Sequence, residues 1–108
     1  DIPAVSGQAV QDRLDKNEDF ILLDVRLDID VARYWIEAPQ RQHVSLNQIT
    51  ERYNEIPLGK TLVVVDKNGK RAGLAARYLS AKGYKDLSVL SGGMIQWIKS
   101  GLPTKMNK

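Results

Sequence analysis

The chain has 108 residues, 43% of them hydrophobic, and a formal net charge of +3, which fits one compact domain that buries roughly two-thirds of its unfolded surface. Its longest apolar runs, at residues 20–23 and 62–65, are far shorter than the roughly 20 residues needed to cross a bilayer, so we expect no membrane insertion. The absence of cysteine excludes disulfides, thiolate nucleophiles and cysteine-ligated metals, and leaves the compartment open.

In the first third of the chain, apolar runs alternate with helical patterns. Ser6 favours an N-cap position for a first helix. The run 20–25 then predicts a buried strand. Asp28 or Asp30 can open a short helix that continues through residues 31–35, because carboxylates stabilise the positive end of a helix.

The middle of the chain predicts a short strand, a helix and a central strand. Residues 43–46 form the short strand, and Asn47 can cap a helix that carries Ile49, Tyr53 and Ile56 on one stripe. The next apolar run, residues 62–65, consists of four β-favouring side chains in a row. Such a run is typical of a central strand covered on both faces.

The last third predicts a helix, a strand and a closing helix. The first of these helices places four side chains inward: Leu74, Ala75, Tyr78 and Leu79. Residues 87–90 form the strand. Gly92 and Gly93 permit a tight turn into the closing helix, which bears Met94, Trp97 and Ile98. The alternation of strands and helices indicates an α/β domain with a small, mostly parallel central sheet and helices on both faces.

The loop after the central strand is the strongest candidate for a functional site. It delivers a polar segment to the N-terminus of a helix, where unpaired backbone N–H groups and the helix dipole favour an anion. The alternative is an ordinary strand-to-helix turn, with asparagine and glycine present for backbone freedom. Its residues are Asp66, Lys67, Asn68, Gly69, Lys70 and Arg71.

Three flanking motifs resemble those of the rhodanese-like (sulfurtransferase) family. They are Leu-Asp-Val-Arg at residues 23–26, the helical segment 75–84, and the closing segment 90–103 with its Leu-Ser-Gly-Gly start. Their order and spacing match the family over nearly the whole chain. The resemblance implies a three-layer rhodanese-like fold and a single domain over residues 1–108, either alone or as part of a longer protein.

In that family the loop has the pattern Cys-x-x-Gly-x-Arg, and the cysteine carries a sulfane sulfur. The matching positions here are Asp66, Gly69 and Arg71. A carboxylate has no accessible persulfide state, so the resemblance implies a domain that cannot relay sulfur. We expect Asp66 instead to accept hydrogen bonds from the loop and to cap the following helix.

A second departure from the family lies at Tyr34 and Trp35, where a Gly-His pair is usual, and we expect these two residues at the rim of the site. The interpretation that follows is a non-catalytic interaction or regulatory module. Its partner would be an unknown protein or a neighbouring domain. We expect no cofactor and no metal. We also expect no nucleic-acid binding, because basic residues are interspersed with acids and only Lys67, Lys70 and Arg71 crowd together.

Two alternatives remain open from the sequence. The chain can be a thiosulfate sulfurtransferase in which the cysteine alone has been replaced, with the rest of the site intact. It can also be a phosphohydrolase with Asp66 as nucleophile, although such enzymes usually carry a second aspartate two positions later, where this chain has Asn68.

Overall fold

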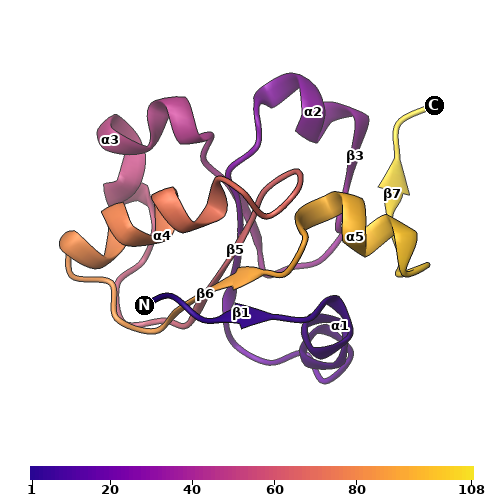
Figure 1. Ribbon diagram of the computed structural model, residues 1–108, viewed down its shortest axis with the longest axis horizontal. Helices are drawn as coiled ribbons and strands as arrows, with labels where there is room; N and C mark the ends of the chain where they lie inside the picture. The colour runs from indigo at the N-terminus through magenta and orange to yellow at the C-terminus, as the bar shows by residue number, and fades with distance from the viewer.

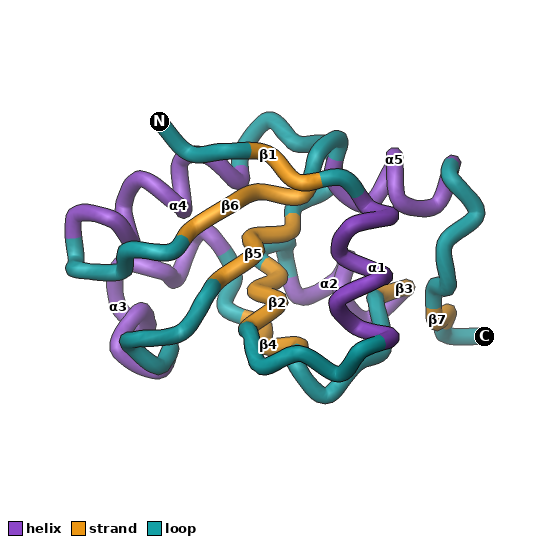
Figure 2. The backbone as a smooth tube through the Cα atoms, turned by 90° about the horizontal axis from the view of Figure 1, so that it is seen from below, coloured by secondary structure: helices purple, strands orange, loops and turns teal.

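A computed structural model of the protein describes residues 1–108. Five parallel strands form one sheet in the order β1-β6-β5-β2-β4, which can be followed in Figure 2. β5 is therefore the central strand, as its unbroken apolar run predicted. In sheet order the strands are Ala4–Val5, Leu87–Leu90, Leu62–Val65, Ile21–Asp24 and Arg41–His43.

Helices cover both faces of this sheet, which gives the three layers expected from the sequence. The helices α3 (Ile49–Arg52) and α4 (Ala72–Ala81) pack on one face, and α1 (Gly7–Asp15) and α5 (Gly93–Lys99) pack on the other. Figure 2 shows the two pairs on opposite sides of the strands. None of the helices has both the length and the apolar character that a membrane span requires.

The two central strands explain why there are two hydrophobic cores. Successive side chains of a strand point to opposite faces. Leu23 and Val64 accordingly belong to the core under α3 and α4, whereas Leu22 and Val63 belong to the core under α1 and α5. A strand with polar residues at alternate positions could not occupy this place, and every residue of β2 and β5 is buried.

The helix predicted to run through residue 35 is shorter in the structure. α2 spans Asp28–Arg33, and Tyr34–Trp35 form β3, which pairs in antiparallel fashion with β7 at Lys105–Met106 (Figure 1). Tyr34 is extended, with φ −158° and ψ 151°. The prediction was wrong at this end because the pairing partner lies about seventy residues away in the chain, beyond the reach of a local pattern.

The helical region after β4 is also divided differently from the prediction. β4 ends at His43, and a 3₁₀ turn, η1 (Leu46–Gln48), begins where the strand was expected to end. Ser45, and not Asn47, is the N-cap residue of that turn. A second 3₁₀ turn, η2 (Tyr53–Glu55), follows α3. The predicted helix is thus three short pieces, in which Ile49 and Ile56 are buried as expected.

The N-cap residue of α1 is the one predicted from the sequence, whereas the buried face of α4 differs from the prediction. The Ser6 hydroxyl oxygen accepts a hydrogen bond from the Ala9 N–H at 3.1 Å. On α4, Leu74 was expected to face inward, but its side chain is 56% exposed. The face toward the sheet is built mainly from small side chains, since its buried residues are Ala72, Ala75, Ala76 and Leu79. The apolar side chain of Leu74 is therefore exposed to solvent in the first turn of the helix.

Candidate functional site

The loop of residues 66–71 lies at the edge of the sheet where the parallel strands end. β5 ends beside β2, because Val65 is in register with Asp24, and β2 ends beside β4, because Asp24 is in register with His43. The segments that follow these three strands therefore meet at one edge. Ligands of open α/β sheets bind at this edge.

The Asp66 carboxylate is fully engaged by the backbone of its own loop. Its Oδ1 accepts a hydrogen bond from the Gly69 N–H at 2.7 Å. Its Oδ2 accepts from the Arg71 N–H at 2.8 Å and from the Ala72 N–H at 2.9 Å. The residue is only 4% exposed. Hydrogen bonds to an ionised acceptor are the stronger ones in proteins, so the carboxylate holds the loop closed and caps α4.

The first residues of α5 are hydrogen-bonded to the backbone of the loop. The Met94 N–H donates to the Asp66 carbonyl oxygen, and the Ile95 N–H donates to the Lys67 carbonyl oxygen, both at 2.9 Å. Gly93 makes this approach possible, since a Cβ on it would lie 2.6 Å from the backbone nitrogen of Asn68. The sequence suggested backbone geometry as the reason for this glycine, but not that the surface it approaches is the loop.

The remaining side chains of the loop point outward. The Asn68 Oδ1 accepts a hydrogen bond from the Lys70 N–H at 3.0 Å, a contact inside the loop. The side chains of Lys67, Lys70 and Arg71 are exposed and make no hydrogen bond or ion pair within the chain. Three positive charges are thus available at the surface, while the negative charge of the loop is internal.

A pocket of about 340 Å³ opens beside the loop. It lies between the loop and the segments that follow β2 and β4. Its lining residues are Val25, Arg26, Leu27, Asp30, Leu46, Asp66, Lys67, Asn68 and Arg71. Four of the six predicted loop residues therefore line it, whereas Gly69 and Lys70 do not.

The two aromatic residues expected at the rim do not line this pocket. The Tyr34 ring lies under the Arg26 guanidinium, whose Cζ is 4.7 Å from the ring centroid. The Trp35 ring lies under Arg41 at 5.5 Å, and its Nε1 donates to Glu37. Both are held by β3 and β7, to the side of the pocket.

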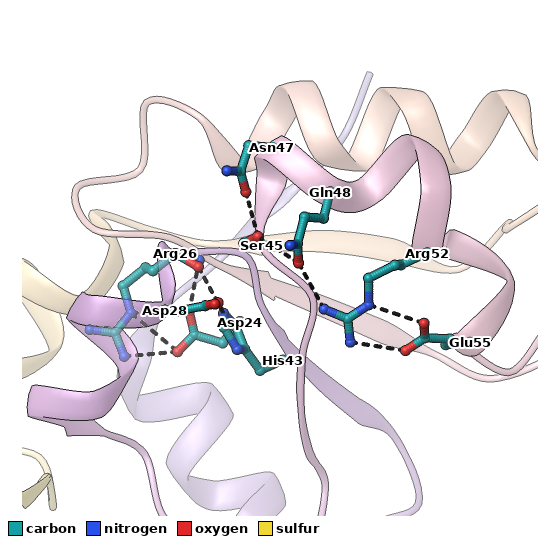
Figure 3. Close-up of polar contacts among 9 residues, drawn as sticks. All are labelled: Asp24, Arg26, Asp28, His43, Ser45, Asn47, Gln48, Arg52 and Glu55. Carbon is teal, nitrogen blue, oxygen red and sulfur yellow. Dashed lines mark hydrogen bonds and ion pairs between the residues drawn. The ribbon is translucent and has the colours of Figure 1, made fainter.

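The pocket wall opposite the loop rests on a buried ion pair between Asp24 and Arg26 (Figure 3). The Arg26 Nη2 donates to the Asp24 Oδ2 at 2.8 Å and to the Tyr34 carbonyl oxygen at 2.7 Å. Its Nη1 is buried and has no hydrogen-bond partner. His43 lies close by, with its Nε2 2.8 Å from the Arg26 carbonyl oxygen. These contacts fix the turn after β2.

A second polar chain runs from η1 along the outer side of this region (Figure 3). The Arg52 Nη1 donates to the Gln48 Oε1 at 2.9 Å, and Arg52 donates two further hydrogen bonds to the Glu55 carboxylate. These hydrogen bonds lower the pKa of Glu55. The group lies outside the pocket and serves to hold the short helical pieces together.

The pocket residues after β2 and β4 were missed by the sequence analysis. Leu27 and Asp30 follow the Leu-Asp-Val-Arg segment, and Leu46 follows β4. Their positions depend on which strands are neighbours in the sheet. The signal that could have found them is the rule that connections after neighbouring parallel strands meet at the same edge.

Comparisons with known proteins agree on one family. The family model described as Rhodanese-like domain matches residues 6–100. A sulfurtransferase from Allochromatium vinosum is 31% identical over 99 residues, which cover 92% of this chain and 91% of that protein. A rhodanese-related protein from Thermoplasma volcanium has the same fold, with a TM-score of 0.84 at 19% identity over 97% of this chain and 99% of that one. The reduced CoADR-RHD of Bacillus anthracis matches with a TM-score of 0.77 at 27% identity, over 89% of this chain and 16% of that one.

Proposed function

The chain belongs to the rhodanese-like domain family, and we propose that it is a non-catalytic member that serves as an interaction or regulatory module. The observation that carries this proposal is the set of three hydrogen bonds from Gly69, Arg71 and Ala72 to the Asp66 carboxylate. At the position where the family has its sulfur-carrying cysteine, this chain has a carboxyl group that its own loop already binds.

Two properties of Asp66 argue against sulfur transfer. A carboxylate oxygen cannot accept and return a sulfane sulfur, because the reaction requires a thiolate that becomes a persulfide. In addition, the backbone N–H groups that would stabilise an incoming anion already donate to this carboxylate. An external anion would have to displace a group attached to the same loop, which is unfavourable.

The same geometry disfavours a phosphohydrolase with Asp66 as nucleophile. Both carboxylate oxygens accept N–H hydrogen bonds, which lowers their nucleophilicity, and the residue is almost completely buried. Asn68, two positions later, uses its side-chain oxygen within the loop. We expect no magnesium-dependent release of p-nitrophenol from p-nitrophenyl phosphate. Hydrolysis by the native chain that is lost in the variant Asp66→Asn would contradict this expectation.

A role as a module is supported by the way related domains occur. The chain matches only 16% of the CoADR-RHD protein from Bacillus anthracis, so a domain of this kind can be one part of a longer chain. The partner proposed here is a separate protein or a neighbouring domain. It would meet the surface around the loop, where three cations are unpaired.

Thiocyanate formation from thiosulfate and cyanide tests the absence of catalysis. We expect none from the native chain, and Asp66→Ser serves as a matched variant that also lacks a thiol. Asp66→Cys shows whether only the nucleophile is missing: turnover in this variant means that the remaining site is intact, and its absence means that the loop or the pocket has also diverged. Turnover by the native chain, at a rate proportional to its concentration, would overturn the proposal.

A further inference from the structure

Positive charge is concentrated in the second part of the chain. Residues 67–108 contain nine lysines and arginines and a single acidic residue, whereas residues 1–66 contain seven basic and twelve acidic residues. The formal net charge is thus +8 for the second part and −5 for the first. The expectation that basic residues are interspersed with acids is therefore wrong for residues 67–108, and the charge difference between the two parts is large enough to matter for association.

The structure places part of this excess at the loop. Lys67, Lys70 and Arg71 are exposed and form no ion pair. Three cations of the first part are paired instead, since Arg26, Lys60 and Arg52 contact Asp24, Asp19 and Glu55 respectively. The three loop cations are therefore free to interact with another molecule.

Exposed apolar side chains lie at the same edge of the sheet. Leu27 is 51% exposed and Ile29 is 60% exposed, both directly after β2, and Leu27 also lines the pocket beside the loop. Leu74 in the first turn of α4 and Ile95 in the first turn of α5 are exposed as well. These four residues follow the carboxyl ends of three strands, so apolar and positive groups share one surface.

We propose that this surface docks an acidic segment of a partner protein, with one apolar side chain of that segment in the pocket. The surface is defined by Lys67, Lys70, Arg71, Leu27 and Ile29. Leu27, with Val25 and Leu46, supplies the apolar part of the pocket, whose volume of about 340 Å³ lies in the range of ligand pockets, roughly 300–1,000 Å³. The inference rests on the proposed function as an interaction module and specifies the chemistry of the partner.

The attraction acts through side chains and not through the loop backbone. Asp66 already uses the N–H groups of Gly69, Arg71 and Ala72, so carboxylates of the partner would pair with the cationic side chains around the loop. Asp30, in α2, also lines the pocket. The acidic part of the segment is therefore directed toward Lys67 and Arg71 and away from α2.

A protein segment fits this surface better than a nucleic acid. Single-stranded nucleic acids bind on aromatic platforms beside a continuous positive groove. Here Tyr34 and Trp35 do not line the pocket, and Asp30 interrupts the positive charge. A pocket with an apolar part beside cationic side chains matches an acidic segment that carries a leucine or a similar side chain.

Fluorescence anisotropy with a labelled peptide of glutamates around one central leucine tests this proposal. We expect saturable binding that weakens with added salt, as interactions between exposed charges do. Lys67→Glu/Lys70→Glu should weaken binding about tenfold. Lys85→Glu/Lys99→Glu reverses the same number of charges away from the loop and should change binding less than about twofold. Circular dichroism should show both variants folded.

The remaining probes separate the possible outcomes. Replacing the peptide leucine by serine should weaken binding about tenfold, since the pocket then receives no apolar group. Equal losses in the two charge variants would indicate attraction to net charge alone and would overturn the proposal. So would absence of saturable binding at low salt, or equally tight binding of a single-stranded oligonucleotide of the same charge. Failure here leaves the thiocyanate result unaffected, so the docking surface and the lack of catalysis are judged separately.

Discussion

Gly93 lies directly against Asp66: a Cβ atom on Gly93 would stand 2.7 Å from the Asp66 carbonyl oxygen. The two residues belong to the ends of different structural units, the turn into α5 and the loop after β5. Because the Met94 N–H donates to that same carbonyl oxygen, the contact is both a close approach and a hydrogen-bonded junction. The shape of the loop thus depends on a residue that follows it by more than twenty positions.

Replacing Gly93 by alanine should destabilise the protein strongly. Its φ is +60°, and the new Cβ would meet backbone atoms that cannot move without opening the loop. We expect a loss of about 2 kcal/mol or more in the free energy of unfolding, measured by urea denaturation. Gly101→Ala is the matched control, since its φ is +75° but nothing lies within 4 Å of the added Cβ. Its loss should be about 1 kcal/mol. Equal losses at the two positions would show that the contact is unimportant.

Removing the Asp66 carboxylate should both destabilise the loop and open it to external anions. In Asp66→Ala, three backbone N–H groups lose their acceptor, and we expect a loss of roughly 2 kcal/mol. Sulfate should then raise the melting temperature of the variant more than that of the native chain, because an anion can occupy the freed donors. Sodium chloride at matched ionic strength controls for screening. The same sulfate response in both proteins would mean that the carboxylate does not block this position.

The Asp24–Arg26 pair should be costly to break and less costly to replace. Asp24→Ala leaves a buried guanidinium without its counter-ion, and its Nη1 has no partner even in the native protein. We expect a loss of about 3–5 kcal/mol. The double variant Asp24→Ala/Arg26→Met removes the buried charge and should recover part of this loss. Chemical denaturation of the native chain and of all variants gives the coupling between the two residues. The prediction would be contradicted if the double variant lost as much free energy of unfolding as the single variants Asp24→Ala and Arg26→Met lose together.

Tyr84 should contribute to stability at neutral pH and lose this contribution in alkali. Its hydroxyl lies within hydrogen-bond distance of the carbonyl oxygens of Tyr53 and Ile56, and burial raises its pKa above the ordinary tyrosine value. The contribution is fully present below the unfolded pKa of about 10 and falls as the pH rises through the folded pKa. Tyr84→Phe should cost about 1–2 kcal/mol at pH 7. The difference from the native chain should shrink above about pH 10, and a constant difference would contradict the assigned cause.

The strands could be predicted because their signal is local. Residues 62–65 are apolar at every position, and this alone indicated a central strand, which β5 is. The hydrogen bonds of Asp66 were also predictable, since a short loop between a strand and a helix restricts where the carboxylate can reach. In both cases the interacting groups are close in sequence.

The features that could not be predicted depend on distant partners. Trp35 is in a strand only because Lys105 pairs with it. The pocket contains Leu46 because β4 lies beside β2, an arrangement that the sequence pattern leaves open. Leu74 was assigned to the core by its apolar character, although the small side chains of α4 already fill the space against the sheet.

The pairing of β1 with β6 has a consequence for how the chain reaches this structure. Val5 is in register with Leu90, so the first strand of this domain has no neighbour in the sheet until β6 has been synthesised. β5 pairs with β2, which precedes it in the sequence by about forty residues, so this contact also closes a long loop. The chain loses conformational entropy when it closes these long loops, and it loses this entropy before the strand contacts form and compensate for it. Folding is therefore slower than in helical domains of similar length. During synthesis, β1 is therefore expected to stay unpaired while the strands between it and β6 in the sequence are made.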